Sequence, residues 1–175
     1  MGANWSWATS LINYIIASHL LFVVSGGYLL RKPSTFGTSQ EAFVTLSSVD
    51  RTRKVQGLAL KVQSSGSSNP GLIVVAYDAT IGKVRVSTQR VDGTVATQYA
   101  DTPAVFANGD QLGAQVLANG TVKLYKNGTL LATISLNATD QAFFNSRSGK
   151  IGLTAATGSR KAVFDNFGGG NVIAP

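Results

Sequence analysis

The 175-residue sequence predicts an all-β sandwich, and three observations lead to that prediction. Glycine is frequent, with 19 residues, and only 13% of the residues are charged, which is typical of sheets joined by tight turns. Short runs rich in β-branched residues recur at a spacing of about 8–12 residues. Asn-Gly and Asp-Gly pairs separate several of these runs, and such pairs favour hairpins because a type I′ turn needs positive φ at both central residues.

The expected strands follow one another from residue 42 onward. Each run is about five to eight residues long and ends at turn-forming residues. They are Ala42–Leu46, Val55–Val62, Leu72–Tyr77, Lys83–Thr88, Thr94–Tyr99, Gln111–Leu117, Thr121–Lys126, Leu130–Leu136, Lys150–Ala155 and Ala162–Phe167. Several alternate apolar and polar residues, as half-buried strands do. The inward faces of two strands are expected to carry Leu112, Ala114 and Val116, and then Val122 and Leu124. In the next strand, Leu130, Ala132, Ile134 and Leu136 are expected to share one face.

Residues 1–30 form a divergent apolar segment ahead of the sandwich, which is expected over residues 31–175. The run Ala8–Val24 is marginal in length for a membrane span and contains Asn13 and His19, so no membrane span is expected. No basic region precedes the run and no small-residue cleavage site follows it, so a signal peptide is not expected either. We expect early strands, with Leu20–Val24 and Tyr28–Leu30 forming a hairpin.

A subunit-contact arm is the other interpretation of this segment. An exposed apolar arm would pack against a neighbouring copy of the chain or against another subunit. The candidate contact residues are Leu11, Ile12, Tyr14, Ile15, Ile16, Leu20, Leu21 and Phe22.

The chain is basic, with a formal net charge of +7, but its charges are scattered. Only Arg51–Lys54 forms a cluster, and Lys83 and Arg85 alternate with valines as on the solvent face of a strand. Nucleic-acid binding would need a basic stripe interleaved with aromatic residues, which is not found. We expect no nucleic-acid partner, although the charge favours acidic partners.

Residues that carry out chemistry are scarce. The chain has no cysteine, and His19, its one histidine, lies in an apolar run. Glycoside hydrolysis needs two carboxylates on either side of the scissile bond. Glu41 is the one glutamate, and most of the seven aspartates lie beside Gly, Asn or Thr, where turns favour them. We therefore expect neither enzymatic activity nor a required cofactor.

The C-terminal half contains four segments in a recognisable order: Gly109–Ala114, Asn119–Gly128, Gly149–Leu153 and Phe164–Gly170. This series resembles the jelly-roll domains of the concanavalin A-like lectin/glucanase and laminin-G-like superfamily. Upstream, Gly2–Trp5, Glu41–Leu46 and Val74–Asp78 are similar to the earlier strands, so the resemblance covers most of the chain. It implies an antiparallel two-sheet jelly-roll sandwich.

The sequence departs from this superfamily at its start. Related domains usually begin with a strand before the Asn-Trp pair, and that strand pairs near the terminal Asp-Asn-Phe. Only Met1–Ala3 precede Asn4 here. The strand is therefore either absent or supplied by a neighbouring chain through strand addition.

Two kinds of site follow from the resemblance. Glycan binding would use exposed aromatic residues, and the candidates are Trp5, Trp7, Tyr77, Tyr99 and Tyr125. Filling the core or its rim is the other role open to them. A structural calcium ion would be held by Asp165 and Asn166, for which a simple turn is the alternative. Asn4, Asn119, Asn127 and Asn137 begin N-glycosylation sequons.

Three functions remain open from the sequence. The main expectation is a non-enzymatic structural protein of an extracellular assembly, namely a decoration, head-fibre or tail component of a phage or virus particle. A jelly roll without an evident export signal suits assembly in the cytoplasm, and the apolar segment then becomes an interface. The alternatives are a glycan-binding module of a secreted or cell-surface protein, and a strand-exchanging filament or surface-layer subunit.

Overall fold

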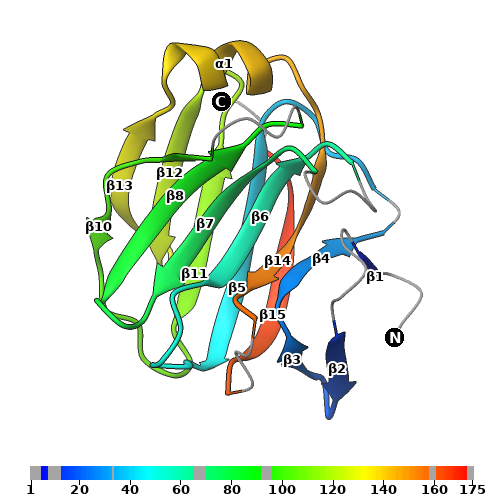
Figure 1. Ribbon diagram of the computed structural model, residues 1–175, viewed down its shortest axis with the longest axis vertical. Coiled ribbons are helices and arrows are strands. Elements are labelled where there is room, and N and C mark those ends of the chain that lie inside the picture. The colour runs from blue at the N-terminus through cyan, green and yellow to red at the C-terminus, as the bar shows by residue number, and fades with distance from the viewer. Residues whose placement is uncertain are drawn as a thin grey trace.

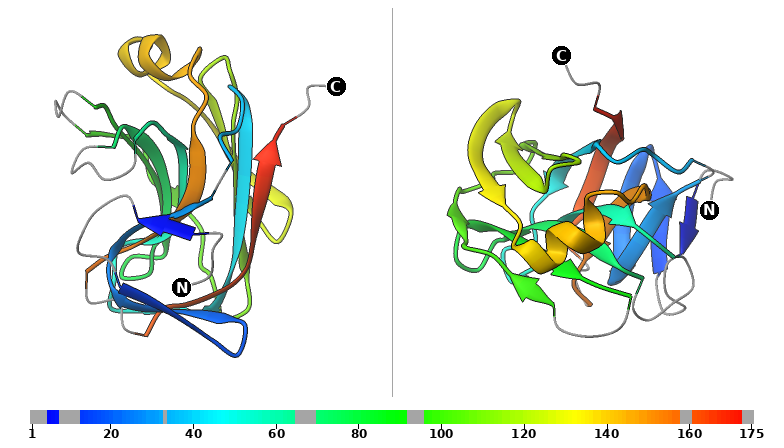
Figure 2. Two further views of the ribbon diagram at one scale, coloured as in Figure 1. Left: turned by 90° about the vertical axis from the view of Figure 1, so that its right-hand side faces the viewer. Right: turned by 90° about the horizontal axis from the view of Figure 1, so that it is seen from above.

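The computed structural model describes residues 5–7, 13–32, 34–64, 70–91, 96–157 and 161–172. Within these ranges the chain forms two antiparallel sheets that pack face to face, as predicted (Figures 1 and 2). The eight-stranded sheet has the order β1 (Trp5–Trp7), β4 (Gly27–Arg31), β14 (Lys150–Ala155), β6 (Gln56–Val62), β7 (Leu72–Asp78), β8 (Lys83–Gln89) and β10 (Thr102–Pro103), and β9 (Thr97–Gln98) also pairs with β8. The seven-stranded sheet has the order β13 (Thr129–Ser135), β12 (Thr121–Lys126), β11 (Gln111–Val116), β5 (Gln40–Ser48), β15 (Val163–Asn171), β3 (Leu20–Ser25) and β2 (Asn13–Ala17).

The core lies between the two sheets, and the period of two in the sequence decides which side chains enter it. Leu112, Ala114 and Val116 of β11 are buried, as predicted, and so are Val122 and Leu124 of β12. The prediction for β13 is wrong at one residue: Leu130 is 51% exposed. A bulge between Leu124 and Tyr125 shifts the register with β13, so Leu130 lies opposite Tyr125 on the outer face.

The predicted hairpin between Leu20–Val24 and Tyr28–Leu30 is wrong, because β3 and β4 belong to different sheets. Gly26 lies at this crossing, where an added Cβ would come within 2.1 Å of the carbonyl carbon of Ala156. The hairpin is instead formed by β2 and β3, and its turn residues Ser18 and His19 both have positive φ, 51° and 67°. Strands β1–β4 thus contribute to both sheets (Figure 1).

A short helix, α1 (Ala138–Phe144), covers one end of the sandwich and was not predicted (Figure 2). Its signal is a capping residue: the side chain of Asn137 accepts a hydrogen bond from the backbone N–H of Asp140 at 2.8 Å. Of the predicted strand Thr94–Tyr99, residues 94–95 lie outside the described ranges and the rest contains β9. No helix in the described ranges is long and apolar enough to span a membrane.

Candidate functional site

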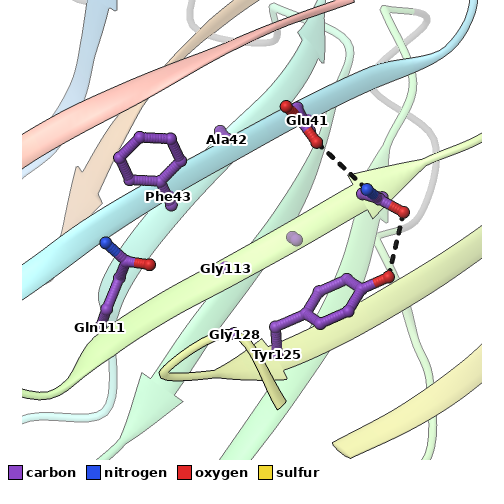
Figure 3. A pocket seen from close by; sticks show the side chains of 9 residues that line it. Glu41, Ala42, Phe43, Gln111, Gly113, Tyr125 and Gly128 are labelled. Carbon is purple, nitrogen blue, oxygen red and sulfur yellow. Dashed lines mark hydrogen bonds between the residues drawn. The ribbon is translucent and has the colours of Figure 1, made fainter. Parts of the chain in front are cut away.

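A hollow of about 240 Å³ opens on the outer face of the seven-stranded sheet, over β5, β11 and β12 (Figure 3). Gly113 of β11 lies at its centre, paired with Phe43 of β5 on one side and with Tyr125 of β12 on the other. Because glycine has no side chain, the space between the two aromatic rings stays open. We call this site the outer hollow; it is lined by Glu41, Ala42, Phe43, Gln111, Gly113, Ala114, Gln115, Tyr125 and Gly128.

A second glycine positions the Phe43 ring. Gly168 of β15 pairs with Phe43, and a Cβ added at Gly168 would lie 2.4 Å from the ring's Cζ atom. The ring therefore occupies the space above Gly168, and Phe43 remains 37% exposed. The two glycines, on the strands that flank β5, thus leave room for one exposed ring and for an open space beside it.

A chain of hydrogen bonds forms the polar side of the outer hollow. The hydroxyl of Tyr125 donates to Oε1 of Gln115 at 3.0 Å, and Nε2 of Gln115 donates to Oε2 of Glu41 at 3.1 Å (Figure 3). The two bonds fix the orientation of the Gln115 amide. The second carboxylate oxygen of Glu41 has no hydrogen-bond partner among the described residues, so it remains an acceptor for a ligand. Among the residues that the structure describes, Glu41 is the one carboxylate lining this hollow, whereas paired acid–base chemistry takes two.

The structure places the predicted glycan-binding residues in different surroundings. Tyr125 lines the outer hollow, whereas the side chain of Trp7 lies outside the described residues. Tyr77 is 1% exposed and packs on Phe106, with 5.0 Å between ring centroids, so the prediction for Tyr77 is corrected: its ring fills the core.

Tyr99 belongs to a hydrogen-bond network beside helix α1. Its hydroxyl donates to Asp140 at 2.6 Å and accepts from the backbone N–H of Asn137 at 3.1 Å. Burial and the bond to Asp140 raise the pKa of Tyr99 to about 12. Both contacts attach Tyr99, the residue after β9, to the start of helix α1, so this hydroxyl has a structural role.

The fifth candidate, Trp5, lines a separate hollow of about 150 Å³ at one edge of the sandwich. Its other lining residues are Ile16, His19, Leu21, Leu153, Phe164, Asp165, Asn166 and Phe167. We call this site the edge hollow. The structure thus brings Trp5 together with both predicted calcium ligands.

Asp165 and Asn166 by themselves supply only part of the ligand set that a calcium ion needs. Calcium takes six to eight oxygen ligands, but one Asp165 oxygen already accepts the backbone N–H of Asn166 at 2.7 Å. Within the described ranges no group of three or more His, Cys, Asp or Glu side chains comes together. One carboxylate and one amide side chain supply fewer oxygens than that ion takes, so calcium binding by Asp165 and Asn166 stays a prediction.

The predicted subunit-contact residues also differ in how exposed they are. Tyr14 and Leu21 are 4% and 6% exposed and lie in the protein's own core, so the prediction that they contact another subunit is wrong. The Tyr14 hydroxyl donates a hydrogen bond to the carbonyl oxygen of Gly27. Ile15 and Ile16 of the edge strand β2 are 51% and 46% exposed. Leu20 and Phe22 are half-buried, and Leu11 and Ile12 lie outside the described residues.

Phe43, Gly113, Gln115 and Glu41 were not predicted as a site. The period of two puts Phe43 and Glu41 on one face of β5, so the sequence carries a signal for their shared direction. The sequence carries no signal for the pairing of β5 with β11, and this pairing brings Phe43 and Glu41 next to Gly113 and Gln115.

Comparisons with known proteins bear on the fold. No protein-family model and no curated protein sequence matches the chain. Among solved structures, a carbohydrate-binding module, CBM66, from Bacillus subtilis is similar with a TM-score of 0.65 and 14% identity over 96% of both chains. The potassium-bound carbohydrate recognition domain of Emp46p has a TM-score of 0.65 and 15% identity, covering 98% of this chain and 90% of that one.

The exoplasmic/lumenal domain of VIP36, bound to Ca²⁺ and Man3GlcNAc, has a TM-score of 0.64 and 12% identity, covering 100% of this chain and 86% of that one. At such low identities these likenesses show the fold alone. The fold is a lectin-like jelly-roll sandwich, as the predicted concanavalin A-like architecture requires, and none of these matches singles out the laminin-G-like branch.

Proposed function

We propose that this chain is a glycan-binding module and that the outer hollow binds the sugar. The observation that carries the proposal is the placement of Phe43 and Tyr125 on either side of Gly113, next to the Tyr125–Gln115–Glu41 hydrogen-bond chain. The similar structures are a carbohydrate-binding module, a carbohydrate recognition domain and a domain bound to Man3GlcNAc, which supports the same function. No other hypothesis from the sequence has comparable support.

The chemistry of a sugar ring matches these groups. A pyranose has an apolar C–H face, which packs on aromatic rings, and a rim of hydroxyls, which need donors and acceptors. Phe43 and Tyr125 would contact the C–H face, and the free oxygen of Glu41 would accept from a hydroxyl. Because Gln115 is already oriented by its two bonds, little side-chain entropy is lost when a ligand binds.

The particle-subunit function expected from the sequence gains no support from the comparisons, since these three similar structures are described by carbohydrate binding or by a bound glycan. Self-association remains a separate hypothesis that rests on the exposed Ile15 and Ile16 of β2. Size-exclusion chromatography separates the two ideas, because a glycan-binding monomer needs no second copy.

A glycan array followed by calorimetric titration of the best glycan tests the proposal. Tyr125→Ala and Phe43→Ala should each weaken binding about tenfold or more, since each removes one ring that contacts the sugar. Tyr125→Phe should cost less, because it keeps the ring and loses only the hydroxyl. Ile81→Ala is the matched control: Ile81 is 49% exposed but lies in the β7–β8 turn.

Two results would overturn the proposal. One is an array and titrations that detect no bound glycan with the folded wild-type chain. The other is a glycan whose affinity is unchanged in both Tyr125→Ala and Phe43→Ala. Circular dichroism of each variant establishes that a loss of binding does not come from unfolding.

A further inference from the structure

The edge hollow lies beside the short pairing between β3 and β15 in the seven-stranded sheet. Within the described part of the chain, β3 pairs with β15 through Val163–Phe22 and Phe164–Leu21 alone. A bulge then follows between Asp165 and Gly168, where Asn166 adopts a positive φ of 47°. Strand β1 of the opposite sheet brings Trp5 to the same place, on the side where β1–β4 gather (Figure 1).

The floor of this hollow is apolar and two of its walls are aromatic. Leu153 and Phe164 are each 1% exposed and Leu21 is 6% exposed, so the floor consists of closely packed apolar side chains. Trp5 and Phe167 are in ring contact, with centroids 5.3 Å apart and ring planes 50° apart. Both rings are half-buried, so each keeps some surface for a ligand.

The rim of the hollow is polar. It carries the exposed imidazole of His19, the amide of Asn166 and the carboxylate of Asp165. One oxygen of Asp165 accepts the Asn166 N–H, which leaves its second oxygen for a ligand. The bulge places the Asp165 and Asn166 side chains at the rim together, and the positive φ of Asn166 is one that Asn and Gly tolerate.

We propose that the edge hollow is a second sugar-binding site, which takes one neutral or amino hexose ring. The ring's C–H face would pack against Trp5 and its hydroxyls would meet Asp165, Asn166 and His19. A fully apolar ligand would leave these polar groups unpaired, and an acidic sugar would be repelled by the Asp165 carboxylate. The edge and outer hollows share no lining residue, so this proposal does not depend on the proposed function.

Two sites on one chain would give it a property that one site lacks. A monomer with two separate sugar sites can bridge two glycan chains, or bind one branched glycan with an affinity above that of either site. Such bridging would need no association between copies of the protein.

The indole N–H signals of ¹⁵N-labelled protein test the proposal directly. The chain has two tryptophans, so two such signals are expected, and Trp7→Phe assigns the remaining one to Trp5. The probes are the methyl glycosides of mannose, glucose, galactose and glucosamine. We expect at least one of them to shift the Trp5 signal in a saturable way, both in the wild-type chain and in Tyr125→Ala.

Asn166→Gly provides a matched variant, because glycine accepts the positive φ at this position while the amide is removed. It should weaken the Trp5-monitored affinity about fivefold and leave the outer hollow unaffected. Asp165→Asn should also weaken binding, since it removes the charged acceptor.

Three outcomes would overturn the second site. They are a Trp5 signal that no probe moves up to its solubility limit, a shift that disappears in Tyr125→Ala, and an affinity that neither Asn166→Gly nor Asp165→Asn changes. A saturable Trp5 shift in a chain whose outer hollow binds nothing would refute the proposed function alone and would support this site.

Discussion

The ammonium nitrogen of Lys61 donates a hydrogen bond to the backbone carbonyl oxygen of Phe144, 2.6 Å away, at a place that solvent does not reach. Lys61 lies on β6, and Phe144 is the last residue of helix α1. The carbonyl groups at a helix C-terminus carry partial negative charge, which suits an ammonium donor. This bond attaches the helix to the eight-stranded sheet.

Lys61 should make the stability of the fold depend on pH. Burial lowers the pKa of this amine from 10.5 to about 8, so between these two values the unfolded chain binds more protons than the folded one. The free energy of unfolding should therefore rise with pH, by roughly 2 kcal/mol between about pH 7.5 and 9.5. Urea titrations across this window measure the rise.

Lys61→Met should lose this rise, and the exposed Lys54→Met should keep it. The window ends below pH 10 for a reason: burial raises the pKa of Tyr14 and Tyr28 above 10.0, so buried tyrosines lower stability once they titrate in the unfolded chain. A wild-type chain and a Lys61→Met variant with the same pH dependence would contradict the prediction.

Asp140 should be one of the costliest polar residues to replace. It is fully buried and accepts hydrogen bonds from the hydroxyls of Thr88 and Tyr99 and from Arg90, whose Nη1 lies 3.2 Å away. Asp140→Asn leaves these donors facing an amide, and we expect a loss of roughly 3 kcal/mol in chemical denaturation. Asp101→Asn, which breaks a more exposed pair with Arg85, should cost under about 1 kcal/mol. Equal losses of stability in Asp140→Asn and Asp101→Asn would contradict this prediction.

Tyr99→Phe tests the structural role of that ring separately. It removes one hydroxyl from the Asp140 network, so we expect a loss of about 1 kcal/mol in stability. Glycan affinity should stay unchanged, because Tyr99 lines neither hollow. If Tyr99→Phe keeps its stability but no longer binds the glycan, Tyr99 is a binding residue after all.

Asp110 should contribute to stability in acid. Its burial acts to raise its pKa, but hydrogen bonds from the Ala107 N–H, Asn127 and Lys126 outweigh this and lower the pKa to about 2 from 3.8. Because the pKa of Asp110 is lower in the folded chain than in the unfolded chain, its ionised form stabilises the fold at pH values above the unfolded pKa. This stabilisation is lost as the pH falls from the unfolded pKa to the folded pKa. We expect Asp110→Asn to flatten the acid side of the stability profile by roughly 1–2 kcal/mol, measured by urea denaturation. Parallel acid losses in the two chains would contradict this.

Local signals predicted the turns and strand faces well where one residue pair decides the geometry. Asn127 and Gly128 both have positive φ, 50° and 78°, as a type I′ turn requires. At Asn119-Gly120 the hairpin forms, but of this pair only Gly120 has positive φ, because the loop is longer. The pair Gly26-Gly27 looks the same in the sequence as a hairpin turn, yet the chain there passes from one sheet to the other. Local sequence does not distinguish these two outcomes.

The candidate site was predicted only in part, for a related reason. Alternation along β12 indicates that Tyr125 points outward, and that prediction needs no tertiary information. Phe43 and Glu41 reach Tyr125 through β11, and β5 pairs with β11 and β15, which are both distant in sequence. Long-range pairing of this kind follows from the packing of the whole sandwich.

Replacing Gly113 should change both the stability of the sheet and the proposed glycan binding. A glycine inside a strand is unfavourable by about 0.5–1 kcal/mol, and a Cβ added at this position would make only ordinary contacts, the nearest at 3.4 Å from Cβ of Tyr125. Gly113→Val should therefore raise the free energy of unfolding slightly, because valine suits a strand. The same side chain would fill the outer hollow, so glycan affinity should fall about tenfold or more.

Gly57→Ala is the contrasting control, since its Cβ would lie 2.3 Å from the carbonyl oxygen of Val75 on the neighbouring strand. That variant should lose stability by roughly 2 kcal/mol, which shows that not every strand glycine here is free to change. Denaturation and glycan titration of both variants give the result. If Gly113→Val leaves the glycan affinity unchanged, the sugar does not bind in the space between Phe43 and Tyr125. If Gly113→Val is more stable than the wild-type chain and no longer binds the glycan, glycine is present at this position for function and at the expense of stability.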